Sequence, residues 1–172
     1  MNEAVAERSA PGFGPASAAR LVALLLPLAL LGGALGSQYL GGLHPCEMCM
    51  WQRWPHAVAI VLALLAFTSP AESTRSRAPV LLAALAIAVS GCIGVYHAGV
   101  EAKIFEGFTQ CTATGKGLSP SELLQEISHA PLVRCDEVQF RFLGISMAGW
   151  NAILSLGGAA LIVILTLRGR RA

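Results

Sequence analysis

Four apolar segments without a single Asp, Glu, Lys or Arg constrain this chain more than any other feature. A helix needs roughly 20 apolar residues to cross the roughly 30 Å hydrocarbon core of a membrane. The second segment is shorter than the others and would rely on Trp51 and Trp54 as interfacial anchors. The pattern predicts an all-α membrane protein, a bundle of four transmembrane helices. The segments are Leu21 to about Leu40, about Trp54 to Ser69, Pro79 to about Val100, and about Ser146 to Leu167.

The composition supports a membrane protein and argues against a nucleic-acid partner. Only 13% of the 172 residues are charged, whereas a soluble domain has about a quarter. The net charge is +2, and no basic cluster is interleaved with aromatic residues. The length fits one domain.

The first apolar segment has an alternative interpretation as a cleaved signal peptide. Ala34-Leu35-Gly36 resembles a small-residue cleavage site. The segment is long for the apolar region of a signal peptide, and residues 1–19 contain both acidic and basic side chains. We therefore expect a retained membrane span.

The distribution of Lys and Arg predicts the orientation in the membrane. Loops that face the cytoplasm are enriched in these residues. Seven basic residues fall before the first segment, between the second and third, and after the fourth: Arg8, Arg20, Arg75, Arg77, Arg168, Arg170 and Arg171. The pattern predicts cytoplasmic tails at 1–19 and 168–172, a transmembrane domain at 20–167, and outer loops at about 41–53 and 101–145.

Four of the five cysteines fall in the two outer loops. Cys46 and Cys49 form a Cys-x-x-Cys motif in the first loop, and Cys111 and Cys135 lie in the second. In a bacterium-like cell this side is oxidising, so disulfides form and persist there. Cys92 lies inside the third segment, in a small-residue stretch typical of helix packing.

A Cys-x-x-Cys motif can be redox-active, metal-binding, haem-attaching or structural. Haem attachment requires His directly after the second cysteine, and Met50 stands there. The ring that this pair closes is too short for an effective structural staple. Cys46, Met48, Cys49 and Met50 together could bind a soft metal such as Cu(I). The motif favours reversible thiol–disulfide chemistry, with metal binding as the alternative.

Arg53 is a candidate for activating one of the thiols. If the second helix starts near Cys49, Arg53 lies one turn further on the same face. A guanidinium and a helix N-terminus both favour the thiolate of Cys49. The alternative is an arginine that extends to the membrane interface without a functional role.

The second outer loop is rich in Gly and Pro but contains one predicted helix. Ser119 and Glu122 fit a capping box, with Pro120 at the first helical position. The apolar stripe of this helix, at 123–127, would rest on the membrane surface or pack on the loop. Cys111 and Cys135 bracket it, and a disulfide between them would either exchange with a partner or staple the loop.

His97 stands at the outer end of the third apolar segment. An ionisable side chain at membrane depth is a candidate functional residue, although a single histidine there can also be solvated. Glu101 follows one turn later. The other histidines form no constellation in the sequence.

These motifs together resemble the DsbB family, the bacterial inner-membrane disulfide bond formation proteins. The resemblance covers about residues 20–165, including the stretch from Val133 to Asn151. It rests on four spans, Pro45-Cys46-x-x-Cys49-x-x-x-Arg53, Tyr96-His97-x-Gly99-Val100-Glu101, and the second pair Cys111 and Cys135.

The resemblance implies an enzyme that reoxidises DsbA, a soluble periplasmic thiol oxidase, and passes the electrons to ubiquinone or menaquinone. Cys111 would form the mixed disulfide with DsbA, and Cys135 would exchange with Cys46. Cys49 would face the quinone, with Arg53 and His97 beside the ring. The family further implies the inner membrane, with the cysteine loops in the periplasm. The resemblance gives no role to Glu101 or Cys92.

Overall fold

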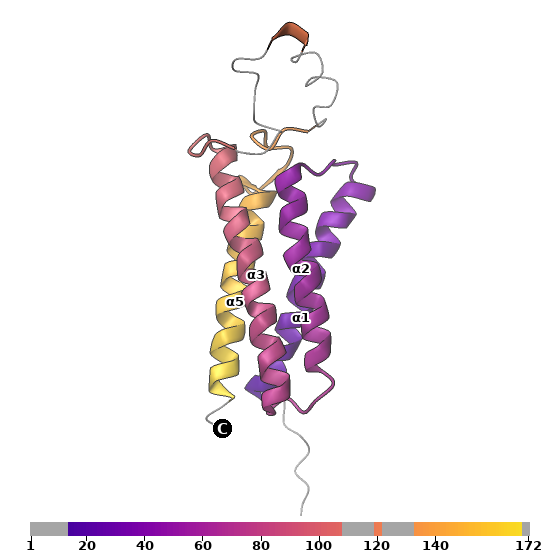
Figure 1. The fold of residues 1–172 in the computed structure, drawn as a ribbon, viewed down its shortest axis with the longest axis vertical. Coiled ribbons are helices and arrows are strands. Elements are labelled where there is room, and N and C mark those ends of the chain that lie inside the picture. The colour runs from indigo at the N-terminus through magenta and orange to yellow at the C-terminus, as the bar shows by residue number, and fades with distance from the viewer. Residues whose placement is uncertain (1–13, 108–118, 122–132, 170–172) are drawn as a thin grey trace, which may run out of the picture.

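The computed structural model describes residues 14–107, 119–121 and 133–169, and four long helices dominate this part of the chain (Figure 1). The helices lie alongside one another. We call the end that carries Pro15 and Arg168 the terminal end, and the opposite end, which carries Cys46, the cysteine end. The helices are α1 (Pro15–Tyr39), α2 (Glu47–Ala66), α3 (Thr74–Glu101) and α5 (Met147–Arg168).

Each helix begins at a residue suited to its start. Pro15 occupies the first turn of α1, where its missing N–H costs nothing. Ser73 and Ser146 cap α3 and α5 by accepting hydrogen bonds from the backbone N–H groups of Ser76 and Gly149. All four helices therefore extend beyond the apolar segments into the flanking polar residues.

Three of the helices in the described part of the chain are long and apolar enough to cross a membrane. They are α1, α3 and α5. The helix α2 is 20 residues long, but its first two turns carry polar and charged side chains such as Glu47 and Arg53. The protein is thus a multi-pass helical membrane protein, and membrane crossing by α2 stays a prediction.

The half of the bundle nearer the terminal end is packed through small residues. Its buried cluster consists mainly of alanines, which let neighbouring helices approach closely, as helix pairs in membranes generally do. Leucines and valines such as Leu64 and Leu85 point outward instead. The cluster contains Ala19, Ala23, Ala59, Ala63, Ala66, Val80, Ala83, Ala84, Ile87, Ala159 and Ile162.

The helices α3 and α5 are in close contact at Gly94. A Cβ atom on Gly94 would lie 3.0 Å from both the Ala148 oxygen and the Ala152 nitrogen, which are backbone atoms. Glycine is therefore needed here for the two helices to stay at this separation.

A short two-stranded antiparallel hairpin, which the sequence patterns did not predict, precedes α5 of this otherwise helical fold. β1 (Arg141–Phe142) pairs with β2 (Ile145–Ser146). Leu143 and Gly144 form the turn with φ of 51° and 80°, the left-handed values that a tight two-residue hairpin requires. The predicted helix at 119–127 lies mostly outside the described residues.

Candidate active site at the cysteine end

The Cys-x-x-Cys motif forms the N-terminus of α2. Cys46 is the N-cap, and its sulfur accepts a hydrogen bond of 3.3 Å from the backbone N–H of Cys49. This contact brings the two Sγ atoms to 2.9 Å. The helix begins at Glu47, so Cys49 lies in its first turn, where the helix dipole favours a thiolate.

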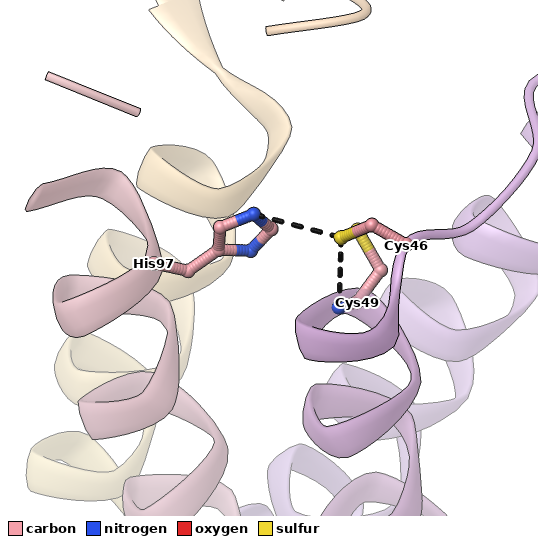
Figure 2. A group of neighbouring side chains, drawn as sticks. All are labelled: Cys46, Cys49 and His97. Atoms are coloured by element: carbon pink, nitrogen blue, oxygen red, sulfur yellow. Dashed lines mark hydrogen bonds between the residues drawn. The ribbon is translucent and has the colours of Figure 1, made fainter. Parts of the chain in front are cut away.

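His97 reaches the same pair of sulfurs from α3. Its Nε2 lies 3.6 Å from Cys46 Sγ, and only 2% of the residue is exposed (Figure 2). Its Nε2 is also 3.8 Å from Oε1 of Glu101, one turn along α3. The structure therefore places His97 and Glu101 together at the cysteine pair, a proximity that the sequence alone did not establish.

Cys135 is buried against Cys46. The two side chains are hydrogen-bonded and share an apolar cluster with Met48 and Val100. These sulfurs come from segments almost 90 positions apart in the sequence. Of the second predicted pair, Cys111 lies outside the described residues.

Ion pairs hold the Cys135 segment to the end of α3. Asp136 accepts hydrogen bonds from both Arg134 and Lys103. These bonds, first from Arg134 and then from Lys103, hold the pKa of the Asp136 carboxyl well below its usual range. Lys103 itself adopts a left-handed φ of 60° in the turn after α3. The residue next to Cys135 is thus fixed by charge.

The two thiols of the motif differ in acidity. Both lie outside the apolar segment, which starts at Trp54. Hydrogen bonds to Cys135 and Cys49, with burial, raise the pKa of Cys46. The hydrogen bond from Cys46 lowers the pKa of Cys49; burial opposes this, and the Arg53 charge adds a smaller lowering effect. Cys49 is therefore the more readily ionised of the two thiols.

Arg53 is held by α1. Its guanidinium donates to the Gln38 side-chain oxygen and, over 3.1 Å, to the Ala34 carbonyl oxygen. The predicted closeness to Cys49 is present, but the larger influence on Cys49 is its own partner Cys46. The main contacts of Arg53 fix the guanidinium beside the cavity described next.

A cavity of about 310 Å³ opens between the cysteine end of α1 and the other helices. One apolar wall comes from α1, including Leu30, Leu31 and Ala34. Its polar groups include Cys49, Arg53 and His97. A mostly apolar cavity with a few convergent polar groups is typical of a small-molecule site.

A chain of buried polar side chains runs from His97 into the bundle. Gln52 Nε2 lies 2.8 Å from His97 Nδ1, and Gln52 Oε1 accepts from Asn151 Nδ2 over 2.8 Å. Asn151 Oδ1 and Ser90 Oγ both lie 2.9 Å from His56 Nε2. No role was predicted for Gln52, Asn151 or their partners Ser90 and His56, although polar side chains within or beside apolar segments are a detectable signal.

The fold brings together two of the four sulfurs proposed for a soft metal, those of Cys46 and Cys49. Met48 is buried in the apolar cluster, and Met50 is exposed. Ligand atoms of Cys46, Cys49 and His97 lie within 4.8 Å of one another. The ring nitrogen of His97 thus joins the two cysteine sulfurs as a possible third ligand.

Comparisons with a family model and with individual proteins point to the same family. The model of the family described as "Disulfide bond formation protein DsbB" matches residues 16–165. Disulfide bond formation protein B of Azoarcus sp. (strain BH72) is 30% identical over 149 residues, 83% of this chain and 87% of that protein. Its counterpart from Xanthomonas campestris pv. campestris (strain 8004) is 29% identical over 141 residues, 80% and 82% of the two chains.

A further relative is known only as uncharacterized protein RP370 of Rickettsia prowazekii (strain Madrid E). It is 25% identical over 139 residues, 79% of each chain. No solved structure matches the chain.

Proposed function

The chain belongs to the DsbB family of disulfide bond formation proteins, and from this we propose that it is a dithiol:quinone oxidoreductase that reoxidises a periplasmic DsbA-like thiol oxidase. Family membership gives the coarser role, a membrane disulfide oxidoreductase. The observation that carries the finer proposal is the buried contact between Cys46 and Cys135 beside a thiolate-favouring Cys49.

The proposed reaction moves two electrons through two cysteine pairs. A thiolate of the reduced partner attacks Cys111 of a Cys111–Cys135 disulfide and releases Cys135 as a thiolate. Cys135 attacks Cys46 and releases Cys49. The partner's second thiolate then completes its own disulfide and frees Cys111. Attack of Cys111 on Cys135 finally releases Cys46, which leaves the motif reduced. Each step exchanges one sulfur–sulfur bond for another.

The cavity supports a quinone as the acceptor. A bound ubiquinone or menaquinone would accept two electrons and two protons and leave as the quinol, while Cys46 and Cys49 regain their disulfide. The apolar wall of α1 suits an isoprenoid chain, and the Arg53 guanidinium can donate a hydrogen bond to a carbonyl oxygen of the ring. Cys49, with its lowered pKa, lines the same cavity.

We also propose the orientation and the fourth span. The arginine distribution favours a cytoplasmic terminal end and a periplasmic cysteine end in the bacterial inner membrane. Membrane crossing by α2 follows from this, because α1 and α3 both run from the terminal end to the cysteine end, so the chain has to cross back between them. The bilayer is the expected surrounding of the exposed leucines and valines.

Turnover with purified components tests the proposal. The protein is mixed with a reduced thioredoxin-like dithiol protein and a soluble ubiquinone or menaquinone analogue, and quinone absorbance is followed. We expect stoichiometric quinol and partner disulfide, with turnover lost in Cys49→Ser and Cys135→Ser. The matched control is Cys92→Ser, which removes an exposed cysteine from outside the site and leaves turnover unchanged.

Two results would contradict this function. One is quinone reduction that persists in the Cys49→Ser protein. The other is stoichiometric copper bound from metal-depleted buffer with no quinone turnover, which would favour a soft-metal protein.

A further inference from the structure

The orientation of the Gln52 side-chain amide is fixed by its neighbours. Gln52 is 6% exposed, and its Nε2 lies 3.2 Å from the Met48 carbonyl oxygen. A carbonyl oxygen only accepts hydrogen bonds, so the amide nitrogen must occupy this side. The Gln52 oxygen then faces Asn151 Nδ2.

A second backbone contact fixes the amide of Asn151 independently. Its Nδ2 lies 3.2 Å from the Ser90 carbonyl oxygen, and its Oδ1 accepts from Ser155 Oγ over 3.1 Å. The nitrogen of Asn151 therefore donates to Gln52. Asn151 thus donates to Gln52, and Gln52 in turn donates to His97.

The direction of these bonds determines the tautomer of His97. Gln52 Nε2 donates to Nδ1 over 2.8 Å, so Nδ1 presents a lone pair and carries no hydrogen. The hydrogen of the neutral ring is then on Nε2. That nitrogen faces two acceptors, the Cys46 sulfur and the Glu101 carboxylate.

The tautomer decides where the thiol hydrogen of Cys46 goes. The Cys46 sulfur accepts the N–H of His97 and the backbone N–H of Cys49. Its own hydrogen cannot then be donated to His97. It is left for the neighbouring sulfurs, Cys49 at 2.9 Å and Cys135.

We propose that Gln52 is a positioning residue that holds His97 in the Nε2–H tautomer, so that the Cys46 thiol hydrogen is donated to its sulfur partners, Cys49 among them, and not to His97. The benefit to electron transfer rests on the proposed function, whereas the tautomer rests on the hydrogen bonds alone. Gln52 acts through His97 and Cys46, and it lines the same cavity as Cys49.

The same arrangement opposes metal capture by the reduced site. A histidine that binds a metal usually donates its other ring N–H to an acceptor. Here Nδ1 of His97 already accepts a hydrogen bond from Gln52. Nε2 could bind a metal only if it lost its hydrogen, and Nδ1 would then have no hydrogen to donate. Gln52 thus favours thiol–disulfide chemistry over metal binding at the point where ligand atoms of Cys46, Cys49 and His97 meet.

Nitrogen-15 NMR of the reduced protein in lipid nanodiscs tests the tautomer directly. We expect His97 to show an unprotonated Nδ1 and a protonated Nε2 near neutral pH. A protonated Nδ1 with a bare Nε2 would overturn the proposal. The measurement needs no variant, so it holds even where substitutions impair folding.

Gln52→Met tests the consequence for Cys49, because methionine has a similar shape and no hydrogen to donate. We expect a mixture of His97 tautomers and a two- to tenfold slower alkylation of Cys49 by iodoacetamide near pH 7, roughly the effect of one hydrogen bond. The rate is read by mass spectrometry of the Cys49 peptide across pH.

Ser155→Ala is the matched control. It removes a hydrogen bond from the same polar chain but leaves Gln52 and His97 in contact. The tautomer and the alkylation rate should remain those of the parent protein. An unchanged Cys49 rate in Gln52→Met, or an equal change in Ser155→Ala, would contradict the positioning role. Neither assay uses quinone or partner, so loss of quinone turnover would affect only the proposed function.

Discussion

The two ends of the helix bundle are held together by different interactions. Toward the terminal end, alanines such as Ala59, Ala63 and Ala83 are fully buried, and the helices meet through close apolar packing. Toward the cysteine end, α2, α3 and α5 meet through the hydrogen bonds of Gln52 and Asn151. There α1 contributes one wall of a cavity.

The two halves of the bundle therefore differ in role: the alanine half stabilises the fold, and the polar half carries the chemistry. Small-residue packing is dense and leaves little room for a ligand, whereas a buried polar group is costly unless every partner is present. The polar half of the bundle is therefore expected to tolerate few substitutions without loss of function. Substitutions in the alanine half should change stability alone.

The largest effect is expected from Arg53→Met at the cysteine end. Loss of a charged donor held by Gln38 and Ala34 should lower kcat/KM for the quinone by roughly 10- to 100-fold, as hydrogen bonds to charged groups suggest. Steady-state quinone reduction measures it. Arg168→Met, which removes an exposed arginine at the terminal end, should leave kcat/KM unchanged, and an equal loss there would refute the assignment.

Gly94→Val should reduce both stability and turnover, because Gly94 lies between Ser90 and His97 on α3, in the polar half, and packs directly on α5. The added side chain would press on backbone atoms of α5 and on Asn151 Nδ2, which lies 3.2 Å from the position of a Cβ. We expect a loss of about 1–3 kcal/mol in stability and a several-fold loss of turnover. Unfolding in mixed SDS micelles and quinone reduction measure the two effects.

Gly157→Ala serves as the control for this substitution. Within the described residues nothing lies within 4 Å of a Cβ at Gly157, so stability and turnover should both be retained. If Gly94→Val behaved like Gly157→Ala, α3 and α5 would not be in the close contact described.

Ala63→Leu should change stability without changing chemistry. Ala63 is fully buried in the alanine cluster, and three extra carbon atoms would cost about 1–3 kcal/mol. Thermal unfolding measures this loss, while kcat/KM per folded molecule should stay at the parent value. Leu64→Ala, on the exposed face of the same helix, provides the comparison and should have a smaller effect.

The smallest effect is expected from Lys103→Met, because the lysine is largely exposed and salt screens such pairs. Formation of the Cys46–Cys135 disulfide should slow a few-fold at low salt and less at high salt. Gel-shift analysis after rapid quenching measures the rate. An effect that grew with salt would contradict an electrostatic role.

The pH dependence of the same step follows from Asp136. Its pKa is lowered in the folded protein, so its stabilising contribution is complete above the ordinary aspartate pKa of about 3.9 and disappears as pH falls through the lower folded value. The Lys103→Met effect should therefore be constant from neutral pH down to about pH 5. A steep change in that interval would implicate another group.

Sequence patterns predicted where the helices lie along the chain better than which side chains of different helices meet. Hydropathy located the four long helices. Among the described residues, the hairpin at 141–146 was missed, because its turn is Leu143-Gly144 and not the usual Asn-Gly or Asp-Gly. The Cys46 and Cys49 site was evident from spacing. Gln52 and Asn151 were not predicted, because a single polar residue in a helix does not reveal which other helix it faces.

The sequence by itself determined that this chain lies in a membrane, that its charge is unevenly placed, and that four of its cysteines form two pairs along the chain. These properties depend on local composition and on separation along the chain. Only the tertiary structure decided that Cys135 meets Cys46, that Arg53 is held by α1, and that His97 receives a hydrogen bond from Gln52. Such contacts join helices distant in the sequence, and their directions depend on how buried donors and acceptors are satisfied together.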